Sequence, residues 1–266
     1  MAVLLTGIVF LGFPHGALDI FLIDKLSPSR RDVLLLLFFY LLAISAMVLA
    51  WMLVPGGAFL FFIAYSCFHF AQSDLSLDET QGKFLSLEFF ARFLAPFFIP
   101  FGFHSERSLK LAGHIHDTSI LQLLTPLFYG LAIAAVILSV LIVFRGIYHR
   151  LVRREEWQAM SLEPLIVCVL FLVLDPLYSL GIYFCFIHSI KHIVNFLNSP
   201  VQVKMKRLIP FWIIPIVAVV LFALYVDTTF IRIEDSLFKW SIMILSSIAL
   251  PHTFLIHFCK KSKLIR

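Results

Sequence analysis

The chain has 266 residues, of which 61% are hydrophobic and only 14% are charged. A soluble domain of this length is close to half apolar and a quarter charged, and it could not bury this much apolar surface in one core. The composition excludes an ordinary soluble protein and predicts an all-α, polytopic bundle of transmembrane helices. The net charge of +5 requires no nucleic-acid partner, because basic residues gather in the inner loops of membrane proteins and attract anionic lipid.

Charged and turn-forming residues divide the chain into about nine apolar segments (range eight to ten), most of them long enough to cross a bilayer. We predict these segments at residues 1–24, 33–54, 58–77, 84–103, 119–144, 162–179, 181–198, 208–226 and 236–259. Breaks in the pattern fall at Ser27-Pro28-Ser29, at Pro55-Gly56-Gly57 and just after Asp175-Pro176. No internal repeat or linker is evident, so we expect one transmembrane helical domain over residues 1–266.

The basic residues predict how the chain is oriented. With the N-terminus outside, fifteen Lys and Arg residues fall in the inner loops and the C-terminal tail, and three fall in the outer loops. This distribution satisfies the positive-inside rule, requires an odd number of segments and predicts a cytoplasmic C-terminus.

The four cysteines are expected to be packing residues. Cys67, Cys168, Cys185 and Cys259 show no CxxC spacing. Such scattered cysteines favour small buried side chains over a disulfide framework or a zinc site.

Polar residues interrupt four of the apolar segments, where each unpaired polar group costs several kcal/mol. They are His15 and Asp19 in the first segment; Tyr65, His69, Gln72 and Asp74 in the third; His188, His192 and Asn195 in the seventh; and His252 and His257 in the ninth. Ionisable residues inside membrane segments typically mark functional sites.

The spacing of these residues indicates a metal site. His188 and His192 are four residues apart and share one helix face, as two imidazoles must to bind one metal from a single helix. In the predicted orientation His69 and His192 lie at similar depths near the membrane midplane, with His188 one turn above and His15 about one turn below. Four imidazoles from three helices are therefore expected to converge in one layer.

Simpler interpretations stand beside this one. A lone buried histidine is more often a hydrogen-bonding group between helices than a metal ligand. Asp19 and Asp74 lie near the inner ends of their segments, where carboxylates can reach the lipid headgroups. If they are buried, they can accept the outer ring N–H of metal-binding histidines, with Gln72 and Asn195 as neutral alternatives. Tyr65 and His252 are further candidates for supporting the site.

Three strings in the sequence carry a family resemblance. They are Pro14-His15-Gly16-Ala17-Leu18-Asp19, His69-Phe70-x-x-x-Asp74 and His188-x-x-x-His192. Together they resemble the signature of the Brp/Blh family of membrane-embedded β-carotene 15,15′-dioxygenases of bacteria and archaea. The resemblance extends over most of the chain in length, helix count and motif order. It implies Fe(2+) bound by His15, His69, His188 and His192, and it matches a late Pro-His pair to Pro251-His252.

The resemblance implies an iron-dependent oxygenase that cleaves the central 15,15′ double bond of β-carotene, or of a related carotenoid, with O2 to give retinal. It also implies a multi-pass protein of a bacterial or archaeal plasma membrane, in contact with lipid and linked to a microbial rhodopsin through retinal supply. Ile20, Ala71 and Lys191 depart from the family pattern and leave the exact carotenoid open. The alternatives are a non-catalytic carotenoid- or haem-binding membrane protein and a His/Asp proton-coupled transporter, although the chain lacks the repeated halves typical of transporters.

Overall fold

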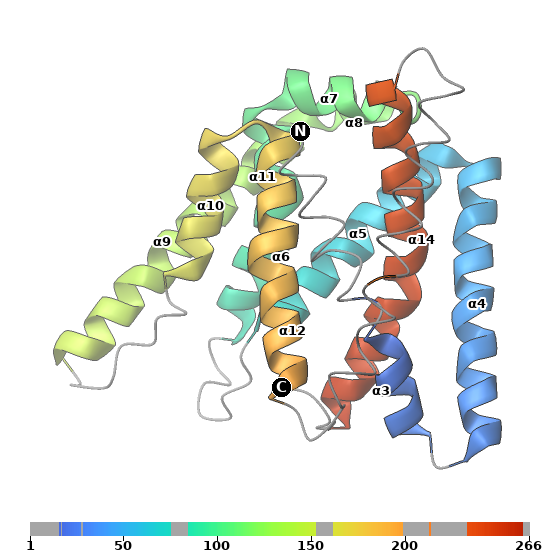
Figure 1. The fold of residues 1–266 in the computed structure, drawn as a ribbon. Coiled ribbons are helices and arrows are strands. Elements are labelled where there is room, and N and C mark those ends of the chain that lie inside the picture. The colour runs from blue at the N-terminus through green and yellow to red at the C-terminus, as the bar shows by residue number, and fades with distance from the viewer. Residues whose placement is uncertain are drawn as a thin grey trace. The chain divides into compact units, whose positions relative to one another are not determined.

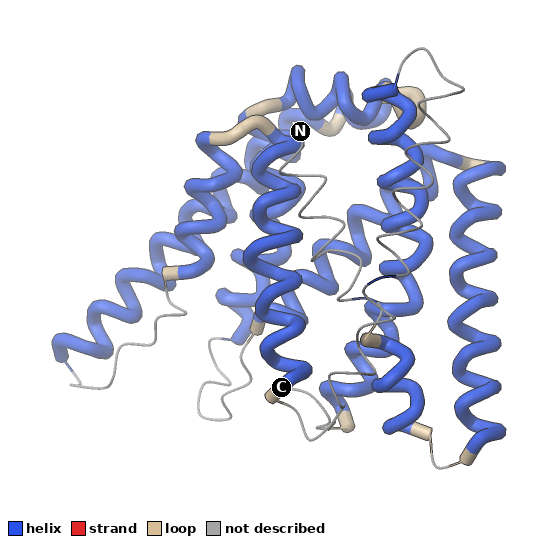
Figure 2. The backbone as a smooth tube through the Cα atoms, viewed as in Figure 1, coloured by secondary structure: helices blue, strands red, loops and turns tan. Residues whose placement is uncertain are grey.

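A computed structural model describes residues 16, 18–27, 29–75, 85–152, 162–198, 213 and 233–262. Every secondary-structure element in these ranges is a helix, which confirms the predicted all-α class (Figures 1 and 2). The helices are α3 (Asp19–Leu26), α4 (Arg30–Leu53), α5 (Pro55–Asp74), α6 (Leu85–Phe103), α7 (Ser105–Gly113), α8 (Ser119–Leu123), α9 (Thr125–Val152), α10 (Glu163–Val173), α11 (Pro176–Ile182), the π-helix η4 (Tyr183–His188), α12 (Ser189–Leu197) and α14 (Ile233–Lys261). His15 and nearly all of the predicted segment 208–226 lie outside the described residues.

Several of these helices have the length and composition of membrane spans. The four that qualify among the described residues are Arg30–Leu53, Thr125–Tyr148, Pro176–Leu197 and Ile242–Cys259. On α4, Leu34 is 68% exposed and Phe38 is 60% exposed, within a long run of uncovered apolar side chains. A soluble protein rarely exposes so large an apolar patch, whereas lipid covers it at no cost. The helices therefore fit a membrane protein, and the number of nine segments and their orientation stay predictions.

The sequence locates some helix boundaries well and misplaces others, including those of the predicted segment 119–144, where α9 begins at Thr125 and ends at Val152. The predicted segment 33–54 corresponds to α4, where Ser29 caps the helix by accepting the backbone N–H of Asp32 at 3.3 Å. The predicted boundary between 162–179 and 181–198 is misplaced, because α10 ends at Val173 and the next helix begins at Pro176. Proline lacks the N–H that would continue a helix but suits the first turn of a new one, and Asp175 caps that turn by accepting the N–H of Leu177 at 3.0 Å.

The chain divides into two compact units, and each is described by itself. The first unit comprises Met1–Ser66 and Phe184–Arg266, and the second comprises Cys67–Tyr183. The expectation of a single domain stays a prediction.

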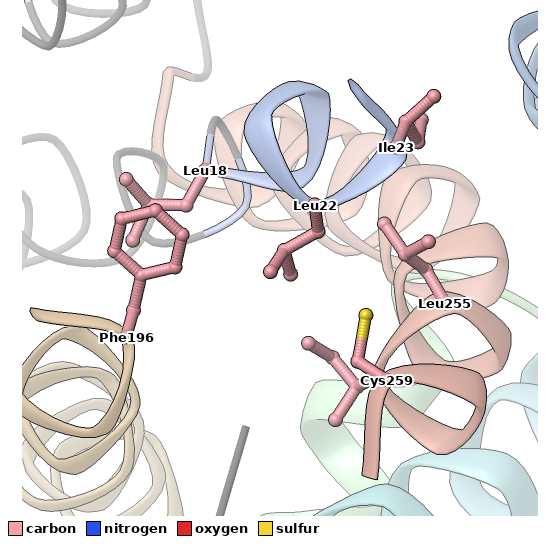
Figure 3. Packing of buried hydrophobic residues seen from close by; sticks show 7 residues of the cluster. Leu18, Leu22, Ile23, Phe196, Leu255 and Cys259 are labelled. Carbon is pink, nitrogen blue, oxygen red and sulfur yellow. The ribbon is translucent and has the colours of Figure 1, made fainter. Parts of the chain in front are cut away.

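In the first unit, α14 packs against α4 and α3, and apolar side chains join α3 and α14 to α12. Figure 3 shows the cluster that they form, which consists of Leu18, Leu22, Ile23, Phe196, Leu255, Ile256 and Cys259. Close van der Waals packing of this kind holds helices together where lipid replaces water. Cys259 is one of four cysteines that are all buried and free, as predicted.

In the second unit, α6 packs against α9 and α10. The α6–α9 contact is tight at Gly102, where an added Cβ would lie 2.9 Å from Cβ of Ala132 and 3.0 Å from the carbonyl oxygen of Phe128. Arg92 of α6 is buried and forms ion pairs of 3.3 Å with Glu88 of its own helix and with Glu163 of α10. Small residues and internally paired charges are how helices associate in an apolar environment.

Candidate metal centre

The two histidines at spacing four lie in a helical stretch whose geometry changes just before them. This stretch runs from Pro176 to Leu197, and its middle part, η4, is a π-helix that ends at His188. The hydroxyl of Ser189 donates to the carbonyl oxygen of Phe184 at 2.7 Å and so satisfies a backbone group in the widened turn. Short π-helical turns occur frequently at functional sites, where they rotate the side chains that follow.

Both histidines are buried, as the sequence predicts for a site inside the bundle. His188 is 0% exposed and His192 is 5% exposed. Their ring centroids are 6.4 Å apart, and the ring of His188 stacks on Phe184. The pair is therefore buried, with one of its rings packed against an aromatic side chain.

A third imidazole joins this pair from another helix. His252 of α14 is 2% exposed, and its ring centroid lies 5.1 Å from that of His192. His192 thus lies closer to this cross-helix partner than to His188, its partner within the same helical stretch. The cross-helix contact places three buried imidazoles in succession within the first unit.

Asp19 also contacts the ring of His252. It is the first residue of α3, and its carboxylate oxygens lie 2.7 and 2.9 Å from Nδ1 of His252. A carboxylate accepts hydrogen bonds, so Nδ1 is the ring atom of His252 that donates to Asp19. The carboxylate is buried, which rules out for Asp19 the alternative of a side chain reaching the headgroups.

Tyr40 provides a second partner for the same carboxylate. Its hydroxyl donates to Oδ2 of Asp19 at 2.7 Å from α4. Tyr40 is not among the residues predicted from the sequence, although a tyrosine inside the strongly apolar segment 33–54 is a signal for a buried polar contact. The carboxylate is consequently fixed by donors from two helices, α4 and α14.

The apolar cluster shown in Figure 3 positions these groups relative to one another. Leu18 and Leu22 flank Asp19 on α3, Phe196 lies one turn after His192 on α12, and Leu255 and Ile256 follow His252 on α14. Because the same three helices carry both the packed side chains and the polar groups, the packing sets the positions of Asp19, His192 and His252.

Four other candidate residues have surroundings of their own. His69 on α5 belongs to the second unit and is 5% exposed. Gln72 on α5 and Asn195 on α12 are half-buried. In the first unit, the hydroxyl of Tyr65 donates to the backbone carbonyl of Ser246 on α14. Tyr65 therefore links α5 to α14.

Asp74, at the end of α5, is also buried. It accepts a hydrogen bond of 2.8 Å from the hydroxyl of Tyr183, and the ring of Tyr183 makes edge contacts with Phe70. This burial again contradicts the alternative of a carboxylate at the headgroups. It places Asp74 inside the second unit, with a tyrosine as partner.

The donor chemistry of the first unit suits a divalent transition metal, because neutral imidazoles are ligands that iron, zinc and copper share. Among the described residues, no group of three or more His, Cys, Asp or Glu side chains is placed to hold a metal ion. Of the four predicted ligands, His188 and His192 are brought together, His15 lies outside the described residues, and His69 belongs to the second unit. The ligand set therefore stays a prediction.

Comparison with known proteins identifies the family. The family model described as "Beta-carotene 15,15'-dioxygenase" matches residues 6–260. The chain is 26% identical over 213 residues to a probable beta-carotene 15,15'-dioxygenase Blh of Halobacterium salinarum, and the alignment covers 73% of this chain and 61% of that protein. It is 27% identical over 192 residues to a beta-carotene 15,15'-dioxygenase of an uncultured marine bacterium, with coverage of 70% and 65%.

No solved structure matches the chain significantly. The matched regions span less than two thirds of the length of either curated relative. The family model, in contrast, extends over nearly the whole chain, and the strings that carry the resemblance fall within it. The chain therefore belongs to the beta-carotene 15,15'-dioxygenase family.

Proposed function

We propose that this protein cleaves the central 15,15′ double bond of β-carotene, or of a closely related carotenoid, with O2 to give retinal. The observation that carries the proposal is the family match over residues 6–260. The buried imidazoles on two helices of the first unit support it, because they supply the type of ligand that an oxygen-activating metal requires.

The proposed metal is Fe(2+), with His15, His69, His188 and His192 as its ligands. His188 and His192 lie together in the structure. His15 immediately precedes Gly16 in the sequence. Gly16 lies beside Ile248 of α14, and Ile248 is one helical turn before His252. His69 is included on the strength of its motif. When bound, iron supplies the activation of O2, which a protein side chain cannot provide.

The chain's own residues supply position and exclusion of water. Asp19 and Tyr40 fix one imidazole, and the apolar cluster of α3, α12 and α14 keeps the polar groups away from solvent. Breaking one carbon–carbon double bond and adding both atoms of O2 gives two aldehydes. The reaction therefore balances without an external reductant or a leaving group.

The membrane is the proposed source of the substrate, since carotenes dissolve in lipid. We propose a multi-pass protein of about nine segments, with the N-terminus outside and the C-terminus cytoplasmic, in the plasma membrane of a bacterium or archaeon. The exposed apolar face of α4 supports contact with lipid. Retinal made there would be available to a microbial rhodopsin in the same membrane.

Expression of the full chain in cells that accumulate β-carotene tests the activity. We expect loss of the orange colour, appearance of retinal on chromatography, and one labelled oxygen in each retinal molecule under ¹⁸O2. The His257→Ala variant is the matched control, because His257 is exposed on the same helix as His252. Persistent colour with folded, iron-loaded protein would contradict β-carotene cleavage and favour a non-catalytic carotenoid-binding protein.

Metal and haem analysis of the same purified protein separates the remaining alternatives. The proposal predicts non-haem iron and no Soret absorption band. A Soret band would identify a haem protein. Absence of any metal, together with proton-coupled uptake in vesicles, would identify a transporter built on the buried His and Asp residues.

A further inference from the structure

We propose that His252 is itself a metal ligand and binds the same metal as His192 through its Nε2 atom. This inference rests on the proposed function, since it adds a ligand to the metal centre proposed there. It concerns a residue to which the spacing of the sequence motifs assigns no role.

The first support is the distance between the rings. Two imidazoles that bind one metal at about 2.1 Å cannot have ring centroids more than roughly 6.5 Å apart. The His192–His252 separation of 5.1 Å lies well inside that limit. The His188–His192 separation of 6.4 Å lies close to the limit. Both separations are therefore compatible with a shared metal.

The second support is the way in which the ring is held. Histidines that bind metals almost always donate their other ring N–H to a carboxylate, a backbone carbonyl or water. Nδ1 of His252 makes this contact with Asp19 at 2.7 Å, and Tyr40 in turn fixes the carboxylate at 2.7 Å. Because the carboxylate engages Nδ1, Nε2 is the ring atom through which His252 would bind a metal.

The third support is the position of the group in the fold. His252 and Asp19 are 2% and 3% exposed and lie on helices that the apolar cluster of the first unit packs together. A buried carboxylate is costly to desolvate, and a divalent cation bound nearby would offset part of that cost. The surroundings therefore suit a carboxylate–histidine–metal arrangement.

A purely structural role predicts something different. In that case His252 would serve to join α14 to α3 through Asp19, and only Nδ1 would matter. The His252→Asn variant separates the two roles, because the side-chain amide of asparagine can occupy the position of Nδ1 and donate to Asp19, but nothing replaces Nε2.

The experiment measures iron binding by the full chain in lipid nanodiscs. Protein stripped of metal is titrated with Fe(2+) without oxygen, and bound iron is measured by mass spectrometry. We expect His252→Asn and His252→Ala each to weaken iron binding at least about tenfold, with His257→Ala unchanged. X-ray absorption of the iron-loaded proteins should show one imidazole ligand fewer in His252→Asn than in the parent protein.

A further variant distinguishes loss of a metal ligand from misfolding of the protein. We expect His252→Gly to lose iron and to regain it when free imidazole is added, which a misfolded protein would not do. Parent-like iron affinity and an unchanged imidazole count in His252→Asn would overturn the inference and leave the proposed function standing. A parent protein that binds no iron at all would instead contradict the proposed function, and the inference with it.

Discussion

Each of the two units contains a buried aspartate that accepts a hydrogen bond from a tyrosine, but the two pairs have different neighbours. Asp19 bonds Tyr40 at 2.7 Å and also holds Nδ1 of His252. Asp74 bonds Tyr183 at 2.8 Å, and that tyrosine packs against Phe70 and Phe171. Through these contacts Asp19 holds an imidazole, whereas Asp74 holds a tyrosine that packs among aromatic rings.

The largest expected effect concerns the imidazole at the centre of the first unit. We predict that His192→Ala reduces iron retention to background and abolishes retinal formation, because His192 lies next to both His188 and His252. Iron content after gel filtration and retinal yield in carotene-accumulating cells are the measurements. Full iron retention by folded His192→Ala would show that the metal lies elsewhere.

The two aspartates can then be compared directly. Asp19→Asn should weaken iron binding about 10- to 100-fold, since asparagine has one acceptor oxygen where Asp19 uses two. Asp74→Asn should change iron affinity much less and should instead lower thermal stability, by about 1–3 kcal/mol, because it disturbs a buried hydrogen bond. Iron titration and thermal unfolding of both variants test this difference. Equal losses of iron affinity in Asp19→Asn and Asp74→Asn would contradict it.

A packing change in the second unit tests whether a loss of stability alone lowers the iron affinity of the protein. Gly102→Ala should destabilise the protein by about 1–3 kcal/mol, because the new Cβ would overlap Ala132 and the backbone of α9. We expect a lower midpoint of thermal unfolding and parent-like iron affinity at low temperature. Gly130→Ala is the matched control, because an added Cβ there meets no atom within 4 Å.

The smallest effects are expected at the two tyrosines. Tyr40→Phe and Tyr183→Phe each remove one hydroxyl donor to a buried carboxylate, at a cost of about 1 kcal/mol in stability. Only Tyr40→Phe should also weaken iron binding, by a few-fold, since only Tyr40 holds the aspartate that orients His252. If Tyr183→Phe weakens iron binding as much, the distinction between the two pairs is wrong.

The sequence alone determined the helical class, the membrane character and most helix boundaries among the described residues, because these follow from composition, apolar run length and local capping. It also indicated that His188 and His192 share a helix face, since four residues correspond to about one turn. One of its errors, at Asp175-Pro176, was local as well, because the proline starts the next helix whereas the predicted segment begins at residue 181.

Only the tertiary structure decided which polar groups meet. The sequence placed His252 only among several candidates for supporting the site and did not single out Tyr40, because the contacts of both with Asp19 span many positions in the sequence. Their contacts with Asp19 join residues 233 and 21 positions apart in the sequence. Such contacts depend on how α3, α4 and α14 are rotated about their own axes. That rotation is set by packing between whole helix faces, for which the local sequence pattern carries no direct signal.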